Sequence, residues 1–391
     1  MISKEKQALA HNNTVLSQIL KLVCRHEFES LAKSHHRGQK LRKISRWAQF
    51  VALSMAQLSG RSSLRDIESN LSAQQSKLYH LGVSKVTRSS LARVNERQPC
   101  ELYEALFDRL LKRCQAMAPG HGFRFKNKLY SLDASTIDLC LSVFPWARFR
   151  TTKGAIKLHA AINHDGYLPS FVALTEGNIH EVKMAQHLKL QSGSIVVFDR
   201  GYIDYAWYNS LNLRNIWFVT RQKRNATYQV LERQAVSASS GLTSDQVIKL
   251  TGTKASQCPI KLRRIGYRDP DTGKHYVFLS NNFKLTAKTI ADIYKSRWQI
   301  EMFFKWIKQN LKIKTFIGTS KNAVMTQIWI ALCVYLILSY LRFTSCMDRS
   351  IQQILKLLQL NLFDRRDLIP LIQGRNVDPP GFSNHNQMSL L

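Results

Sequence analysis

The first 117 residues repeat apolar side chains at the three- and four-residue spacing of amphipathic helices. Two stripes show this spacing best: Leu16, Ile19, Leu20 and Val23, and then Trp47, Phe50, Val51 and Leu53. A further helix pair is predicted over 87–96 and 99–117, because Pro99 favours an interruption of the helix between them. We therefore expect residues 1–117 to form an all-helical N-terminal domain.

The pattern changes to that of strands after a linker that contains Pro119 and two glycines. Strands are predicted over 128–139, 156–163, 168–175, 194–199 and 213–220, with a hairpin turn at 164–167. The run SIVVFD at 194–199 is apolar until its last residues, which is typical of a strand buried on both faces of a sheet. A helix is expected to begin near Glu181. These elements predict the first part of an α/β core over 124–220.

Residues 221–285 interrupt the alternation of strands and helices. They are polar and basic, and they contain a second hairpin, 260–267 with 274–279. We interpret this segment as a β-rich insertion. One continuous helix is predicted over 287–311, within a returning core segment at 286–318. Two or three buried helices follow within 319–373, and a loose tail is expected at 374–391.

The longest apolar run is IWIALCVYLILSYL at 328–341. Its 14 residues fall short of the roughly 20 that cross a bilayer, so a buried helix is predicted and no membrane partner. The N-terminus has no apolar core of the kind found in signal peptides. The seven cysteines are odd in number and form no CxxC, which argues against a zinc site and a disulfide framework. A cytoplasmic location is expected.

The net charge of the chain indicates a binding partner. Lys and Arg number 57 against 26 acidic residues, a formal net charge of +31, while 45% hydrophobic content indicates a globular chain. The excess is spread out: 20 basic against 9 acidic residues lie in 1–115, and 12 against 4 in 221–285. A long polyanion that touches several domains suits this distribution, and double-stranded DNA is the leading candidate.

A basic stretch in the helical region is the predicted DNA contact. No acidic residue lies between Ser30 and Arg65, whereas eight basic residues do. Arg42, Lys43 and Arg46, next to Trp47, are expected to contact phosphates.

The segment YKSRWQIEMFFKWIK at 294–308 carries the candidate chemistry. On one helix, Tyr294, Arg297, Glu301 and Lys308 fall within roughly 60° of one another, along the rim of an apolar stripe. Arg297 precedes Glu301, which is the less favourable order for helix stability. A solvated polar face is the ordinary explanation of such a line, and a functional one competes with it.

Two more carboxylates lie on predicted strands. Asp133 is near the middle of 128–139, and Asp199 ends the buried run, where open α/β sheets place their chemistry. Asp199 could instead cap a following helix. Glu176 and His180 could also lie near the cleft or be structural. Carboxylates that converge with Glu301 need a cation, and Mg²⁺ or Mn²⁺ suits oxygen ligands. Two such ions are expected to support phosphodiester chemistry.

These motifs resemble those of the IS4-family transposases of bacterial insertion sequences, within the wider DDE transposases. The resemblance rests on LDAST with Asp133, VVFDRGY with Asp199, and the line Tyr294-x2-Arg297-x3-Glu301-x6-Lys308. It spans roughly residues 10–345.

The resemblance implies an RNase H-like core with a β-rich insertion, a helical domain that binds terminal inverted repeats, and C-terminal helices. It implies metal-dependent cleavage at the ends of the element, transfer of the freed strand into target DNA, and action as a homodimer. It also implies that Asp133, Asp199 and Glu301 are the catalytic and metal-binding residues, with Tyr294, Arg297 and Lys308 on the DNA.

The sequence departs from the family pattern at one point, and two other functions are compatible with it. Some relatives hold a flipped base with a tryptophan in the insertion, but 221–285 contains none; Tyr228, Tyr267, Tyr276 or Phe278 could stack instead. A non-catalytic DNA-binding protein or inactive transposase derivative would share the charge pattern. So would another RNase H-like nuclease.

Overall fold

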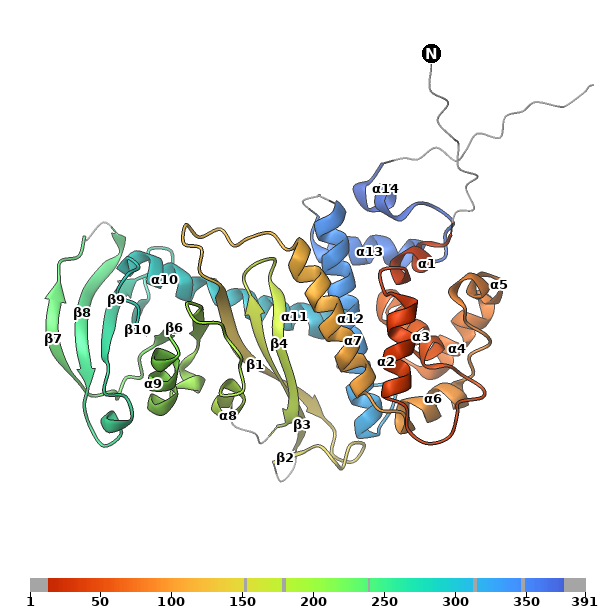
Figure 1. Ribbon diagram of the computed structural model, residues 1–391, viewed down its shortest axis with the longest axis horizontal. Coiled ribbons are helices and arrows are strands. Elements are labelled where there is room, and N and C mark those ends of the chain that lie inside the picture. Colours follow the sequence, from red (N-terminus) through yellow and green to blue (C-terminus); the bar gives the residue numbers. More distant parts are fainter. Residues whose placement is uncertain are drawn as a thin grey trace, which may run out of the picture.

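The strands join into one mixed sheet that meets a body of helices at one end (Figure 1). The computed structural model describes residues 13–150, 153–177, 181–237, 240–311, 315–345 and 349–375. The predicted tail lies outside these residues from 376 onward.

Five strands build the core of the sheet in the spatial order β4-β3-β1-β5-β6. They are β1 (Leu129–Leu139), β3 (Lys153–Asn163), β4 (Leu168–Glu176), β5 (Ile195–Phe198) and β6 (Trp217–Arg221). The short β2 (Arg148–Arg150) pairs with the start of β3, on the edge opposite β1. β1, β3 and β4 are successively antiparallel, whereas β5 runs parallel to β1 and to β6. This RNase H-like order confirms the predicted fold class.

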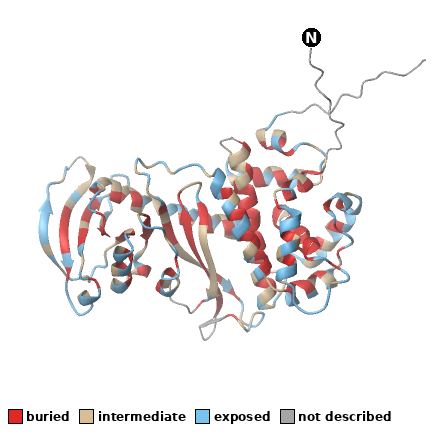
Figure 2. Cartoon of the chain, in the orientation of Figure 1, coloured by how far each residue is buried: buried red, intermediate tan, exposed pale blue. Residues whose placement is uncertain are grey.

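The insertion extends this sheet and does not form a separate layer. Its strands are β7 (Tyr228–Gln234), β8 (Leu242–Leu250), β9 (Lys261–Arg268) and β10 (His275–Ser280). β10 pairs with β6 of the core, and β9, β8 and β7 follow outward in an antiparallel series. The outermost strand, β7, is largely exposed (Figure 2). The predicted β-rich insertion is therefore confirmed.

The strand predicted over 213–220 begins later than expected. Helix α9 (Tyr205–Leu213) occupies the first of those residues, and its first turn is capped by the Asp204 carboxylate, which accepts the Trp207 N–H at 2.7 Å. Asn215 then adopts a positive φ of 53°, which turns the chain into β6 at Trp217. Leu213 is 75% exposed, so it belongs to a helix end and not to a buried strand.

The single helix predicted over 287–311 is wrong: the structure has α10 (Ala287–Ser296) and α11 (Trp298–Asn310). At the junction, the Arg297 N–H donates to the Tyr294 carbonyl and the Ile300 N–H to the Arg297 carbonyl, which are three-residue bonds in place of four-residue ones. This break in the helix changes the direction of the chain. Buried residues of α10 pack against β5, β6 and β9, while those of α11 pack against β1, β3 and the next helix.

The helical body combines both ends of the described chain. The N-terminal helices are α1 (Val15–Leu20), α2 (Arg25–Ser34), α3 (Arg46–Ser59), α4 (Leu64–Ala73), α5 (Gln75–Leu78), α6 (Arg88–Arg97) and α7 (Glu101–Met117). The C-terminal helices are α12 (Lys321–Ser345), α13 (Ile351–Asn361) and α14 (Leu368–Gln373). The Val15 and Leu16 N–H groups donate to carbonyls of Asp364 and Leu362, which ties α1 to the end of α13.

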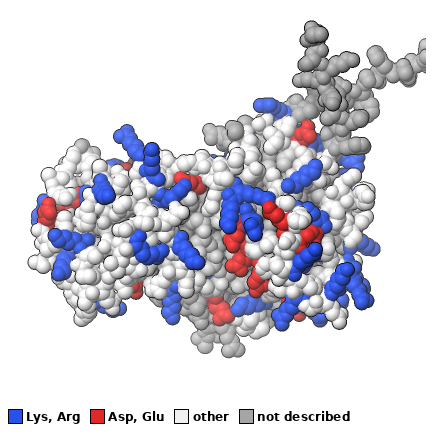
Figure 3. All heavy atoms as spheres, viewed as in Figure 1, with Lys and Arg blue, Asp and Glu red and all other residues white. Residues whose placement is uncertain are grey.

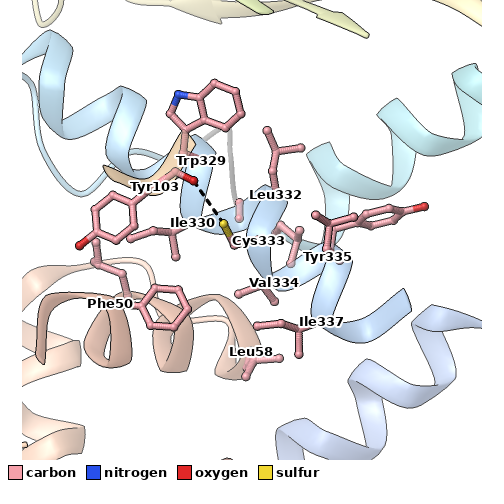
Figure 4. Close-up of a cluster of buried hydrophobic side chains, with 14 of the residues drawn as sticks. Phe50, Leu58, Tyr103, Trp329, Ile330, Leu332, Cys333, Val334, Tyr335 and Ile337 are labelled. Carbon is pink, nitrogen blue, oxygen red and sulfur yellow. Dashed lines mark hydrogen bonds between the residues drawn. The ribbon is translucent and has the colours of Figure 1, made fainter. Parts of the chain in front are cut away.

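Helix α12 lies at the centre of this body (Figure 4). Phe50 and Leu58 of α3, and Tyr103 of α7, pack around its residues Ile330 and Cys333. The same hydrophobic core continues to α11 and to the faces of β1 and β3 that point toward it. The N-terminal helices, C-terminal helices and sheet are thus joined by one shared core.

Length and composition alone would allow α12 to cross a membrane. However, 89% of its most apolar stretch is buried inside the protein. The predicted buried helix is therefore confirmed, and it is the central helix of the core.

We expect Leu336→Ala to lower the free energy of unfolding by about 2–5 kcal/mol, because Leu336 is fully buried in α12. Leu360→Ala is the matched control, since Leu360 is 85% exposed on α13 and should change stability by less than about 0.5 kcal/mol. Urea unfolding of both variants measures the difference. Equal losses would contradict the central role of α12.

Candidate active site

Asp133 and Asp199 are neighbours across two parallel strands. Leu132 of β1 pairs with Phe198 of β5, so the two aspartates occupy the next positions at the point where that pairing ends. β1 continues to Leu139 beside β3 only, which opens the edge of β1 next to Asp133. The carboxyl ends of adjacent parallel strands thus hold two carboxylates side by side.

The backbone holds each aspartate. Asp133 Oδ1 accepts the Ala134 N–H at 2.8 Å, and Asp199 Oδ1 accepts the Gly201 N–H at 2.7 Å. The second bond caps a short 3₁₀ turn at Arg200–Tyr202, so the capping alternative for Asp199 describes a real contact. It engages one carboxylate oxygen, and among the described residues the other accepts no hydrogen bond. Capping and ligand binding are therefore compatible.

The Asp133 carboxyl resists ionisation. Burial raises its pKa to about 6, and the nearby charges of Asp199 and Glu181 act in the same direction. The Ala134 N–H and the Arg297 guanidinium oppose this shift without cancelling it. A bound cation would therefore stabilise the ionised form of the Asp133 carboxyl.

Arg297 links Asp133 to Glu301. Its Nη1 donates to Asp133 Oδ2 at 3.1 Å, and its Nη2 donates to Glu301 Oε1. The guanidinium is 14% exposed and lies between the two carboxylates. Glu301 therefore reaches the aspartates through Arg297: no three Asp, Glu, His or Cys side chains in the described ranges are spaced to hold one metal ion as they stand.

Three of the four predicted residues of 294–308, namely Tyr294, Arg297 and Glu301, line one pocket, although the chain breaks between two helices at Arg297. Tyr294 is on α10, with its ring 4.8 Å from that of Phe278 and 5.8 Å from the Arg297 guanidinium carbon. Lys308 is on α11, and its Nζ donates to the Thr136 carbonyl of β1 at 2.7 Å. The break at Arg297 therefore leaves Tyr294 beside the insertion strand β10, while Arg297 and Lys308 reach residues of β1.

An aromatic pocket of about 320 Å³ adjoins Glu301. Its walls come from the insertion and the kinked helices: Arg221, Tyr267, Asp269, Tyr276, Phe278, Ala291, Tyr294, Lys295, Arg297, Trp298 and Glu301. Of the stacking candidates, Tyr267, Tyr276 and Phe278 line this pocket, with Phe278 only 2% exposed. Tyr228 lies elsewhere in the insertion, with Arg264 over its ring.

Sequence reasoning missed Glu181 as a residue of this cleft. Glu181 begins α8 (Glu181–Ala185), and its charge raises the pKa values of both Asp133 and Tyr202. Its Oε1 accepts a hydrogen bond from Lys157 Nζ at 3.2 Å. Nothing in its sequence neighbourhood marks this role, because only the return of the chain from β4 to β5 brings α8 beside β1. Glu176 pairs with Lys321 at the surface, and His180 lies outside the described residues.

The predicted basic contact in the helical region needs one correction. Arg46 is only 5% exposed: its Nη2 donates to the Pro99 carbonyl and its guanidinium lies over the Tyr103 ring. It is therefore not available to a phosphate. Trp47 is buried as well, and its Nε1 donates to the Leu81 carbonyl. Both are buried because α3 is enclosed on all sides: every residue from Arg46 to Leu58 is buried.

Arg42 and Lys43 are exposed, as predicted, at a basic groove of about 770 Å³. The groove also receives side chains of α6 that sequence reasoning did not assign to it. Its basic residues are Arg37, Lys40, Arg42, Lys43, Arg93 and Arg97.

Comparison with known proteins decides the family. Residues 124–337, more than half of the chain, match the family described as transposase DDE domain. The chain belongs to that family. This transposase also matches a domain of unknown function (DUF4372) over residues 11–84.

Curated relatives agree. The transposase is 30% identical to y4zB of Sinorhizobium fredii, which is named as a transposase, over 74% of this chain and 81% of that protein. It is 28% identical to a protein of Geobacillus stearothermophilus named as the transposase of insertion sequence element IS5377, over 66% and 68%. It is also similar to a solved piggyBac transposase synaptic complex with hairpin DNA, with a TM-score of 0.48 and 12% identity over 96% and 84%. The family match and the curated relatives show that the chain is a DDE transposase, an enzyme class that cleaves DNA, transfers strands and depends on divalent metal ions.

We expect Asp133→Asn to stabilise the metal-free protein at pH 8 by on the order of 2 kcal/mol. The folded-state pKa of Asp133 lies above its unfolded value, so ionisation costs stability as the pH rises through about 6. The gain should therefore shrink as the pH is lowered from 6 toward 4.

Urea unfolding across this pH range provides the measurement. Asp138→Asn, at an exposed position on the same strand, is the control and should leave stability nearly unchanged. A loss of stability in Asp133→Asn at pH 8 would show that its contacts outweigh the cost of burying its charge.

Proposed function

We propose that Asp133, Asp199 and Glu301 are the catalytic carboxylates of this transposase, and that they hold divalent metal ions at the cleaved phosphodiester. One observation carries the proposal: the register of β1 and β5 puts Asp133 next to Asp199, and Arg297 joins Asp133 to Glu301. Carboxylates assembled from two strands and a later helix, around a partly buried guanidinium, are unusual unless a cationic ligand and an anionic substrate meet there.

Mg²⁺ is the metal we propose, with Mn²⁺ as its substitute. The donors are all carboxylate oxygens, which suit these ions, and no cysteine or histidine is needed. Mg²⁺ keeps several waters and uses only one or two carboxylates together with substrate oxygens, so the three carboxylates need not all contact one ion. A bound pair of ions would supply activation of the attacking oxygen and stabilisation of the leaving oxygen.

Arg297, Tyr294 and Lys308 are proposed to hold the DNA end. The Arg297 guanidinium now offsets the charges of Asp133 and Glu301. Where those charges are neutralised otherwise, its fork of N–H groups can pair with a phosphate. Tyr294 borders the aromatic pocket, where it can stack on a base or donate to a phosphate. Lys308 reaches β1, where its Nζ donates to the carbonyl of Thr136, and it adds a second cation.

The helical body is proposed to bind the terminal inverted repeats. Its basic groove presents Arg42 and Lys43 together with Arg93 and Arg97. Figure 3 shows further Lys and Arg side chains over both the sheet end and the helical end of the molecule, a distribution that suits contact with a long duplex. Target DNA would meet the same metal site after cleavage.

We further propose a homodimer in the DNA complex, in which two copies bring both ends of the element together. The reaction would take place in the bacterial cytoplasm, on the nucleoid.

Glu301→Gln is expected to bind end-containing duplex within about twofold of the unaltered protein and to lose Mg²⁺-dependent cleavage by at least about 100-fold. The substitution keeps the size of the side chain and removes only its charge. A gel assay with Mg²⁺ or EDTA measures binding and nicking together.

Asp292→Asn, a half-exposed position on α10, is the control and should cleave normally. Cleavage by Glu301→Gln at the normal rate would refute the assigned role. Binding without cleavage by the unaltered protein, whichever divalent metal is added, would favour an inactive derivative.

Replacing Arg42 and Lys43 together by Gln is expected to weaken DNA binding for every sequence. It should also reduce the slope of log affinity against log salt by about 2, because about one counterion is released for each phosphate contact. Fluorescence anisotropy at several salt concentrations measures both. Lys112→Gln, exposed on α7 away from the groove, is the control. An unchanged slope would place the DNA on another surface.

A further inference from the structure

Glu181 and Asp199 converge on one glycine. A Cβ atom added to Gly201 would lie 2.8 Å from Glu181 Oε2 and 3.0 Å from Asp199 Oδ1. Only a residue without a side chain leaves room for two carboxylates at this distance. The carboxylates of α8 and of the turn after β5 therefore share one small volume next to Asp133.

Two cations near this volume, Lys157 and Arg297, already form ion pairs. Lys157 Nζ donates to Glu181 Oε1 at 3.2 Å, on the side of Glu181 that faces β3. Arg297 is engaged by Asp133 and Glu301. The other oxygen of Glu181, Oε2, is the one that approaches Gly201 and Asp199.

A separate observation points to a ligand at the same place. Tyr202 is fully buried, and its hydroxyl has no hydrogen-bond partner among the described residues. Burial, and after it the charges of Glu181, Asp133 and Asp199, raises the pKa of this phenol well above its ordinary value. A buried hydroxyl without a partner is costly, so its position beside three carboxylates indicates that a polar group completes the site.

We propose that Glu181 is a fourth carboxylate of the active site, which holds a divalent cation together with Asp199, and that Tyr202 is a positioning residue whose hydroxyl donates to an oxygen of the loaded site. This inference rests on the proposed metal-binding role of Asp133 and Asp199. It adds a ligand that lies outside the three carboxylates of that proposal. It also gives Gly201 a function, since a side chain there would push Glu181 and Asp199 apart.

The competing explanation is that Glu181 serves only as the ion-pair partner of Lys157. That pair is partly buried, with side chains 14% and 27% exposed for Lys157 and Glu181. A purely structural pair predicts equal losses of thermal stability in Glu181→Gln and Lys157→Met, with unchanged metal affinity in both. The metal role predicts opposite effects: Glu181→Gln weakens cation binding, whereas Lys157→Met strengthens it because a competing positive charge is removed.

The experiment is a titration of the full-length protein with Mn²⁺, followed by electron paramagnetic resonance in the absence of DNA. Glu181→Gln is expected to lower Mn²⁺ affinity by about 10–100-fold and Tyr202→Phe by about 2–10-fold. Glu176→Gln is the matched control, because Glu176 is exposed and pairs with Lys321 at the surface. It should bind Mn²⁺ as the unaltered protein does.

A parallel titration of Asp199→Asn separates this inference from the proposed function. If Asp199→Asn loses Mn²⁺ affinity while Glu181→Gln stays within twofold of the unaltered protein, the fourth carboxylate is refuted and the three-carboxylate site stands. If Asp199→Asn also retains affinity, the proposed metal site itself fails. A gel shift in EDTA should give unchanged DNA binding for every variant, and circular dichroism checks that each is folded.

Discussion

The parallel pairing of β1 with β5 is the constraint on which the rest of the structure depends. The two strands pair over only four positions, Leu129 to Leu132 with Ile195 to Phe198. Every side chain of β5 in that stretch is buried, so a slip of the pairing by one residue would draw the Asp199 carboxylate into the buried part of the sheet. The register of β1 with β5 is therefore strongly specified. It places Asp133 and Asp199 at the same edge of the sheet.

Burial of the Asp133 carboxyl, and after it the charges of Asp199 and Glu181, makes the ionised form of this group costly. The pKa of Asp133 rises to about 6 in spite of a backbone N–H and Arg297, so the described state is poised to accept a cation. Arg297 can reach Asp133 because the chain kinks at that residue, which lets α10 pack on the insertion side and α11 on β1. The packing of α10 and α11 on different parts of the core therefore determines that Arg297 contacts Asp133.

The helical body is linked to this site through α12 and α11. The core around α12 includes residues of α3 and α7 on one side and of α11, β1 and β3 on the other. Because α11 carries Glu301 and Lys308, the proposed DNA-binding surface of the helices is attached through packed side chains to the helix beside the carboxylates. The insertion reaches the same site from the other direction, through the pairing of β10 with β6 and through the aromatic pocket.

Local patterns were sufficient for much of this protein. Alternation and apolar runs placed the hairpin of β3 and β4, the buried strand β5, the β-rich insertion and the buried helix α12. The spacing of Tyr294, Arg297, Glu301 and Lys308 predicted candidate site residues from one helix face, because side chains three, four and seven residues apart share a face of an ideal helix.

Only the tertiary structure decided the features that depend on long-range packing. Arg46 looked like a surface cation, but its neighbours Pro99 and Tyr103 bury it. The break at Arg297 has no proline or glycine to announce it, and it arises because the two halves of the helix pack on different cores. Glu181 entered the site only through the path of the chain between β4 and β5. The local sequence determines which side chains a segment carries. Contacts between distant segments determine which of these side chains are buried, where a helix bends, and which side chains come together.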